Sequence, residues 1–259
     1  MQCDVITTLR LQESFLKKNF LFVTKDTLSD LNFVLSDVIS FYSKKNFSII
    51  LVNVAQSNSH YNHLLLKSGM NMRSLRDKGK IKVIDVFSEA EKILCDSENE
   101  KCSFFQNFNH GNGDTNSLKC LYISIKEAFE ELCHKEESNC IVVIDEISML
   151  MNVGLNMRSL QPFIQCCYSL CVKNVTPKCT FLIGSICDVF DEENSLLVSY
   201  LHHLADVRIQ VEGLKTGYSQ QVDGKITLEE EDKASGTSSH KEYLFKVADK
   251  GAQLMTLGL

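Results

Sequence analysis

Short apolar runs alternate with amphipathic segments of helical length through the first four fifths of the chain, and this alternation limits the folds that it can adopt. Runs of this kind, rich in Val, Ile, Leu and Phe, are typical of strands buried on both faces. We expect strands at 20–24 (FLFVT), 47–55 (FSIILVNVA), 80–87 (KIKVIDVF), 140–145 (CIVVID) and 179–186 (CTFLIGSI). Strands that alternate with helices favour a parallel sheet with helices packed on it.

The segments between these runs carry apolar residues at helical spacing. In 31–45 the spacing of Leu31, Val34, Leu35 and Val38 places one apolar stripe on the sheet. Further helices are expected at 59–69, 88–95, 118–134, about 156–172 and 191–205. Residues 96–117 lack periodicity and are rich in Asn and Gly, which predicts a long loop or insertion.

The predicted secondary structure changes near the C-terminus, where extended segments follow one another without helices between them. These runs lie at 206–214, 218–230 and 241–257, and Asp223-Gly224 is a hairpin signal. EEEDKASGTSSH (229–240) predicts a solvated, flexible loop. The sequence therefore predicts one α/β domain over 1–259, with a mostly parallel core at about 15–212 and an antiparallel β extension at about 213–259.

Composition restricts the partners and the compartment. The net charge is −6 and the pI about 5.7, so any nucleic-acid contact must use a local basic patch or be shared with a partner. The first residues lack the order of a secretory signal, and no apolar run reaches the roughly 18–20 residues of a membrane helix. Most of the eleven cysteines sit in apolar settings, which indicates buried, reduced thiols in the cytoplasm or nucleus (Cys140, Cys166, Cys167, Cys171, Cys179 and Cys187).

The run ending in Asp145-Glu146 resembles the strand that holds a Mg²⁺-binding acid in nucleotide hydrolases. Such an acid needs a glycine-rich loop beside it, G-x-x-x-x-G-K-[ST], whose amides hold the phosphates. The connection after the first strand, KDTLSD (25–30), has no glycine and carries Asp26 and Asp30. We therefore expect no Walker A loop, no bound cofactor and no catalysis, and a structural role for Asp145 and Glu146, either in capping the next helix or in binding loop amides.

Other residues that could bind a metal ion or a partner also have a simpler structural explanation. His60 and His63, the pair His202-His203, and the cysteines at 166, 167 and 171 lack the spacing of a metal site. The main basic cluster, MRSLRDKGKIKV, contains Arg73, Arg76, Lys78 and Lys80. This cluster fits either contact with RNA phosphates or a partner subunit, or a solvated loop rim.

Several longer stretches resemble subunit six of the Elongator complex, that is, the Elongator complex protein 6 family. They are AQSNSHYNHLLLKSGMNMRSLRDKGKI (55–81), DEEN (191–194), VEGLKTGY (211–218) and YLFKVADK (243–250). Their order and spacing match from about residue 20 to the C-terminus. The resemblance implies a RecA-like fold that has lost its phosphate loop and serves as an accessory, non-catalytic subunit.

The resemblance also implies partners. The family assembles with subunits four and five into a hetero-hexameric ring that binds tRNA and joins the catalytic Elongator subunits, which modify the wobble uridine (U34) at carbon five. Two alternatives stay open: an active ATPase with an unconventional phosphate site at Asp145, and a stand-alone scaffold without an RNA role. Arg76 and Arg158 are conceivable donors to a neighbour's nucleotide site, although surface ion pairs are the more common use of such residues.

Overall fold

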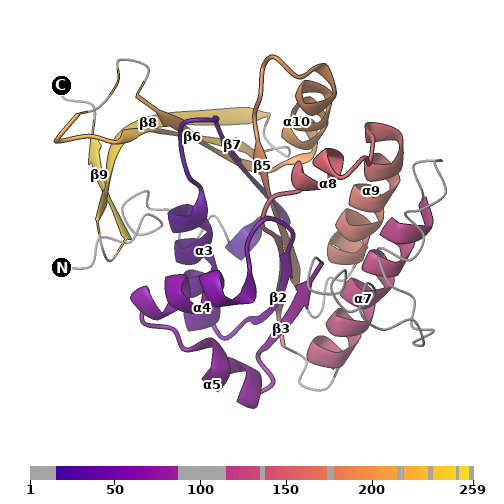
Figure 1. Ribbon diagram of the computed structural model, residues 1–259. Coiled ribbons are helices and arrows are strands. Elements are labelled where there is room, and N and C mark those ends of the chain that lie inside the picture. The colour runs from indigo at the N-terminus through magenta and orange to yellow at the C-terminus, as the bar shows by residue number, and fades with distance from the viewer. Residues whose placement is uncertain are drawn as a thin grey trace.

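The computed structural model describes residues 16–86, 115–134, 138–173, 178–214, 217, 219–232, 236–248 and 251–256. Within these ranges one nine-stranded sheet runs through the molecule in the order β3-β2-β4-β5-β1-β6-β7-β8-β9 (Figure 1). The helix expected at 88–95 and most of the loop expected at 96–117 lie outside the described residues; residues 115–117 belong to a helix.

The strands are β1 (Phe20–Lys25), β2 (Ser48–Asn53), β3 (Ile81–Asp85), β4 (Cys140–Ile144), β5 (Cys179–Ile186), β6 (Val207–Gly213), β7 (Gly224–Asp232), β8 (Thr237–Ala248) and β9 (Gly251–Thr256). Every pairing from β3 to β6 is parallel, and the pairings from β6 to β9 are antiparallel. This arrangement confirms the predicted α/β class with a C-terminal antiparallel extension.

The helices are α3 (Asn32–Lys44), α4 (Asn58–Lys67), α5 (Met72–Asp77), α7 (Thr115–His134), α8 (Met149–Asn152), α9 (Met157–Lys173) and α10 (Glu192–Leu204). They form two layers, with α3 and α4 against one face of the sheet and α7, α9 and α10 against the other (Figure 1). Alternate residues of each central strand supply the two cores: in β1, Leu21 faces α3, and Phe22 faces the opposite layer. Because both faces of each central strand are buried, the strand must be apolar along its whole length.

Strands β1 and β5 lie side by side but lead to helices on opposite faces. Lys25 pairs in register with Ile186, and the Cys187 amide donates to the Lys25 carbonyl at 2.7 Å. From this point β1 continues to α3, whereas β5 continues to α10. The loops after the two strands thus diverge at one edge, which is the topological switch point where α/β sheets bind ligands.

The C-terminal region differs from the sequence prediction at three places. Asp223-Gly224 forms no hairpin turn, because Gly224 already pairs with Gly213 and Phe245, and a Cβ at Gly224 would lie 2.1 Å from the Glu212 carbonyl oxygen. The run 241–257 divides into β8 and β9 rather than forming one strand. The segment 229–240 is largely strand, since Glu229–Asp232 pairs with Thr237–His240.

The cysteines also depart in part from expectation. Cys140, Cys167, Cys171 and Cys179 are buried free thiols, as their apolar settings predict. Cys187 is half-buried, and Cys166 is exposed because it lies on the outer face of α9.

Among the helices that the structure describes, none is both long enough and apolar enough to cross a membrane.

Candidate functional site

The edge at the switch point gathers the polar ends of three strands. Asp145 and Glu146 follow directly after β4, Lys25 is the last residue of β1, and the loop after β2 begins at Val54. Because these strands are parallel, their carboxyl ends meet at the same edge of the sheet. Gly184 of β5 lies against this point so closely that a Cβ there would be 1.9 Å from the Asp145 carbonyl oxygen.

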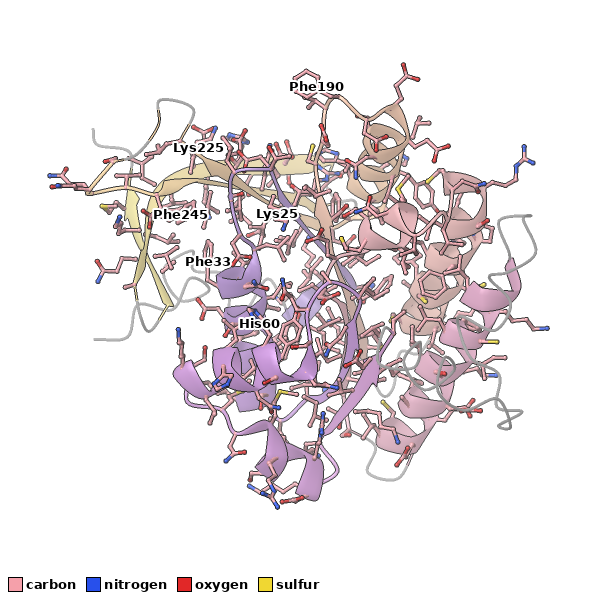
Figure 2. The ribbon with its side chains drawn as sticks, viewed as in Figure 1. Lys25, Phe33, His60, Phe190, Lys225 and Phe245 are labelled. Carbon is pink, nitrogen blue, oxygen red and sulfur yellow. The ribbon has the colours of Figure 1, made fainter. Side chains whose placement is uncertain are left out.

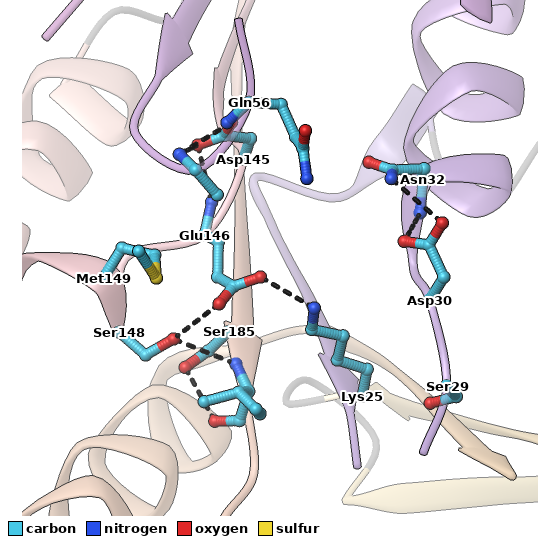
Figure 3. Close-up of polar contacts among 12 residues, drawn as sticks. Lys25, Ser29, Asp30, Asn32, Gln56, Asp145, Glu146, Ser148, Met149 and Ser185 are labelled. Carbon is cyan, nitrogen blue, oxygen red and sulfur yellow. Dashed lines mark hydrogen bonds and ion pairs between the residues drawn. The ribbon is translucent and has the colours of Figure 1, made fainter. Parts of the chain in front are cut away.

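The carboxylate of Asp145 accepts hydrogen bonds on both oxygens. Oδ1 accepts from the amides of Val54 (2.7 Å), Ala55 (3.2 Å) and Glu146 (2.8 Å). Oδ2 accepts from the amides of Gln56 (Figure 3) and Ala55, both at 3.1 Å. It also accepts from the Tyr61 hydroxyl at 3.2 Å. Of the two structural roles expected for Asp145, the structure shows amide binding, to the loop after β2, and Asp145 does not cap the next helix.

Burial decides the electrostatics of this carboxylate. Asp145 is 1% exposed, and burial raises the pKa of its carboxyl above the usual range, while the hydrogen bonds from Val54, Gln56, Ala55 and Glu146 oppose that rise. Burial, with the nearby Asp145 carboxylate, also raises the pKa of the Tyr61 hydroxyl, which therefore stays protonated and donates. With these donors in place, the oxygens of Asp145 have no free lone pairs for a metal ion.

Glu146 is engaged by different partners. Its Oε2 atom lies 3.0 Å from the Lys25 ammonium, with the two side chains only 11% and 20% exposed. The Ser148 hydroxyl lies 3.5 Å from Oε1 of Glu146, and Oγ of Ser148 accepts from the Ile186 amide at 3.1 Å (Figure 3). Glu146 thus links β4, β1 and β5 across the switch point.

Polar residues in the connection from β1 to α3 form hydrogen bonds within the connection and to the end of β6. Asp26 accepts from the amides of Leu28 (3.1 Å) and Gly213 (2.9 Å), and the Ser29 hydroxyl donates to the Val211 carbonyl at 3.0 Å. Asp30 accepts from the Asn32 amide at 3.0 Å and from its side chain at 2.9 Å. The loop that would face a phosphate therefore presents carboxylates and packs against the end of β6.

The basic cluster lies elsewhere. Arg73 and Arg76 are exposed on α5, Lys78 caps that helix and Lys80 precedes β3. Arg76 reaches the Asn58 side chain at 3.4 Å, and Asn58 donates to Asp85 at 2.9 Å. In Figure 1, α5 lies at the lower end of the molecule, away from the loop between β5 and α10. Arg76 thus reaches the start of α4, just beyond the loop that binds Asp145, but none of the four basic residues contacts Asp145 or Glu146 directly.

Neither the histidines nor the cysteines form a metal centre in the part of the chain that the structure describes. There, no three His, Cys, Asp or Glu side chains are arranged to hold an ion. Arg158 is exposed near the start of α9. Sequence reasoning missed Lys25, Tyr61 and Ser148 as members of the site, and a charged residue at the end of an apolar strand is the one signal that points to Lys25.

Solved structures with the same fold place the chain in a class. A KaiC-like protein of Pyrococcus horikoshii aligns with a TM-score of 0.57 and 10% identity, covering 92% of this chain and 89% of that one. The flagellar accessory protein FlaH of Methanocaldococcus jannaschii aligns with a TM-score of 0.59 and 14% identity, with the same coverage. The fold and the switch-point edge thus define a RecA-like α/β protein.

Sequence comparison then gives the family. The model described as Elongation complex protein 6 matches residues 6–249. Elongator complex protein 6 of Homo sapiens is 25% identical over 242 residues, covering 90% of this chain and 89% of the human one. The chain belongs to the Elongator complex protein 6 family, as its sequence motifs indicate, and is a RecA-like subunit of that complex.

Proposed function

We propose that this chain is a non-catalytic subunit of a hetero-hexameric ring formed with Elongator subunits four and five. The ring binds tRNA and supports carbon-5 modification of the wobble uridine by the catalytic Elongator subunits. The observation that carries this proposal is the family match over residues 6–249. The expected location is the cytoplasm, with the nucleus as a second site.

The non-catalytic role is supported by the partners of the two acidic residues. Asp145 accepts from four backbone amides and a tyrosine, and Glu146 is paired with Lys25 at 3.0 Å. A Mg²⁺-nucleotide would have to displace these contacts, and each displaced donor would need a new partner in a buried site. The internal partners of both acidic residues support a role for this edge that does not involve a nucleotide.

The tRNA role is supported by the exposed cationic residues of the basic cluster. Arg73, Arg76 and Lys78 are exposed, and Lys80 is half-buried beside them. An acidic chain needs such a local patch to approach phosphates, and each phosphate contact makes binding weaker at higher salt. Within the assembled ring this cluster contributes to tRNA binding or to subunit contact.

Co-expression with subunits four and five, followed by native mass measurement, tests the assembly. We expect one hexamer that contains all three subunits. A monodisperse monomer of 29.3 kDa beside a separate complex of the other two would contradict the proposal. Copurification with no RecA-like partner would instead favour a stand-alone scaffold.

Charge reversal tests the basic cluster in the assembled ring. Arg73→Glu with Arg76→Glu is expected to lower tRNA affinity about tenfold or more and to reduce the salt dependence of binding, because phosphate contacts are lost. Lys119→Glu with Lys126→Glu on α7 is the matched control, since both lysines are exposed and lie on another layer. Unchanged ring assembly and unchanged tRNA affinity in the first variant would refute a role for the cluster.

A further inference from the structure

A cavity lies between one helical layer and the C-terminal β extension. Its walls come from α3, α4 and the turn that joins β8 to β9, and its volume is about 310 Å³. Pockets that bind small organic molecules begin at roughly this size. Lys25, Asp145 and Glu146 do not line this cavity, so it is separate from the switch-point edge.

Each of the three walls supplies an apolar side chain to the cavity. These are Phe33 from α3, Leu64 from α4 and Val247 from β8. The Phe33 ring packs against Phe245 of β8, with 5.1 Å between the ring centroids (Figure 2). The cavity can therefore remove the apolar part of a ligand from water against a fixed surface.

Two side chains of opposite charge line the same cavity without pairing with each other. Asp30 precedes α3, and its carboxylate accepts from the amide and the side chain of Asn32. Lys67 is the last residue of α4 and forms no ion pair with any residue that the structure describes. Asp37, the third charged lining residue, is buried and takes part in interactions of its own.

The two unpaired charges lie toward opposite ends of α4. The Asp30 carboxylate interacts electrostatically with the hydroxyl of Tyr61, which belongs to the first turn of α4. At the other end Ser68, the neighbour of Lys67, forms a hydrogen bond of 2.6 Å with Ser36 of α3. The six residues from Tyr61 to Lys67 span about 9 Å of helix axis.

The end near Asp30 also carries a buried polar atom without a partner. Nε2 of His60 makes no hydrogen bond within the described part of the chain, and His60 lines the cavity. Its ring packs edge to face on Tyr61, with 5.7 Å between the centroids. An ammonium group has three N–H donors, so it could bind Asp30 and His60 at the same time.

We infer that this cavity binds a small ω-amino carboxylate, a molecule whose ammonium and carboxylate groups are separated by a short apolar chain. The ammonium binds Asp30 and Nε2 of His60, and the apolar chain packs against Phe33. The carboxylate binds the Lys67 ammonium, with one hydroxyl of the Ser36–Ser68 pair free to donate to it. This site is independent of the proposed role in the ring.

Calorimetric titration of the full-length chain with 6-aminohexanoate tests the inference. We expect saturable binding with one site per chain. Hexanoate lacks the ammonium and hexylamine lacks the carboxylate, so each should bind about tenfold more weakly or worse. Glycine carries both charges without the apolar chain between them and should not bind measurably.

Three substitutions place the ligand in the cavity. Asp30→Asn and Lys67→Met should each weaken binding of 6-aminohexanoate about tenfold, because each removes one charge-assisted contact. His60→Phe keeps the ring but removes Nε2, and should weaken binding severalfold. Lys126→Met, at an exposed lysine on α7, is the matched control and should bind as the wild type does. Unfolding midpoints without ligand show whether each variant is folded.

A further probe distinguishes two sources of the same chemistry. Nα-acetyl-lysine carries an ammonium and a carboxylate at a similar spacing, as does the C-terminal lysine of a peptide. Binding tighter than that of 6-aminohexanoate would identify a peptide end as the ligand, and weaker binding would identify a free amino acid.

Three results would overturn the inference. The first is the absence of saturable binding of 6-aminohexanoate and Nα-acetyl-lysine at millimolar concentrations. The second is equal affinity for hexanoate or hexylamine, which would show that the cavity does not recognise both charges. The third is unchanged affinity in folded Asp30→Asn and Lys67→Met variants, which would place the ligand elsewhere. Assembly with other subunits affects none of these measurements, so they can fail while the proposed function holds.

Discussion

Lys25 and Glu146 form an ion pair of 3.0 Å between the ends of β1 and β4, with both side chains mostly buried. The lysine ends the strand that precedes the glycine-free connection at 25–30, and the glutamate directly follows Asp145. The two side chains face each other, so each offsets the charge of the other in a largely buried position.

Removing one member of this pair should destabilise the chain. Glu146→Gln leaves the Lys25 ammonium without its partner in a largely buried position, at a cost of about 3 kcal/mol in the free energy of unfolding. The double variant Lys25→Met with Glu146→Leu removes both charges and should recover most of that loss. Urea denaturation measures all three proteins.

The exposed pair on α7 gives the control for that comparison. Lys126 and Glu130 are 3.8 Å apart and about half exposed. Lys126→Met should cost less than about 0.5 kcal/mol, because exposed pairs are screened by solvent. Equal losses at the two pairs would show that the switch-point pair has no special structural role.

Substitutions around Asp145 should follow the number of hydrogen bonds that each removes. Tyr61→Phe deletes one of six donated bonds and should cost about 1 kcal/mol. Asp145→Asn should cost about 2 kcal/mol or more, because an amide nitrogen cannot accept from the Ala55 and Gln56 amides and leaves them unsatisfied. Thermal or urea unfolding gives the order, and a larger loss for Tyr61→Phe would contradict it.

Gly184→Ala should be among the most damaging single changes in the sheet. The added Cβ would lie 1.9 Å from the Asp145 carbonyl oxygen, a backbone atom that cannot move without displacing β4. We expect a loss of about 4 kcal/mol or failure to fold. Gly69→Ala is the control, since Gly69 has a positive φ but open space around it and should lose only about 1 kcal/mol. Similar losses at both sites would exclude the steric explanation.

Acid should weaken one contact in the β extension. The Lys246 ammonium, 2.6 Å from Asp223, lowers the pKa of that carboxyl below its usual 3.8, and the Val247 amide contributes. The carboxyl therefore adds stability above pH 3.8, which is lost as pH falls through the lower folded pKa. Asp223→Asn should be less stable than wild type at about pH 6 and equally stable once both forms are neutral. A difference between the two proteins that does not change with pH would contradict this.

Sequence patterns predict the parallel core well because burial on both faces requires continuous apolar runs. The run CTFLIGSI coincides with β5, and the helix expected at 118–134 lies within α7. The short helix α5 leaves no such signal, since Met72 is its one buried residue. Asp223-Gly224 is misleading, because Gly224 is needed for close approach to the Glu212 carbonyl oxygen rather than for a turn.

The contacts of the switch point could not be predicted in the same way. Asp145 binds amides of the loop after β2, and Glu146 binds Lys25 of β1. A parallel sheet brings the ends of strands together that are far apart in the chain, and no periodicity records which side chains then meet. The absence of glycine from the loop after β1 is visible in sequence, but the ion pair that lies beside this loop is not.

The most direct test of this account is equilibrium binding of Mg²⁺-ATP to the isolated chain, measured by calorimetry. The account predicts no saturable binding by the wild type. Lys25→Met with Glu146→Leu, which removes the internal ion pair, should not create binding either, because Asp145 remains bound to its amides. Saturable binding by the wild-type chain that Asp145→Asn abolishes, in a variant that still folds, would contradict the account.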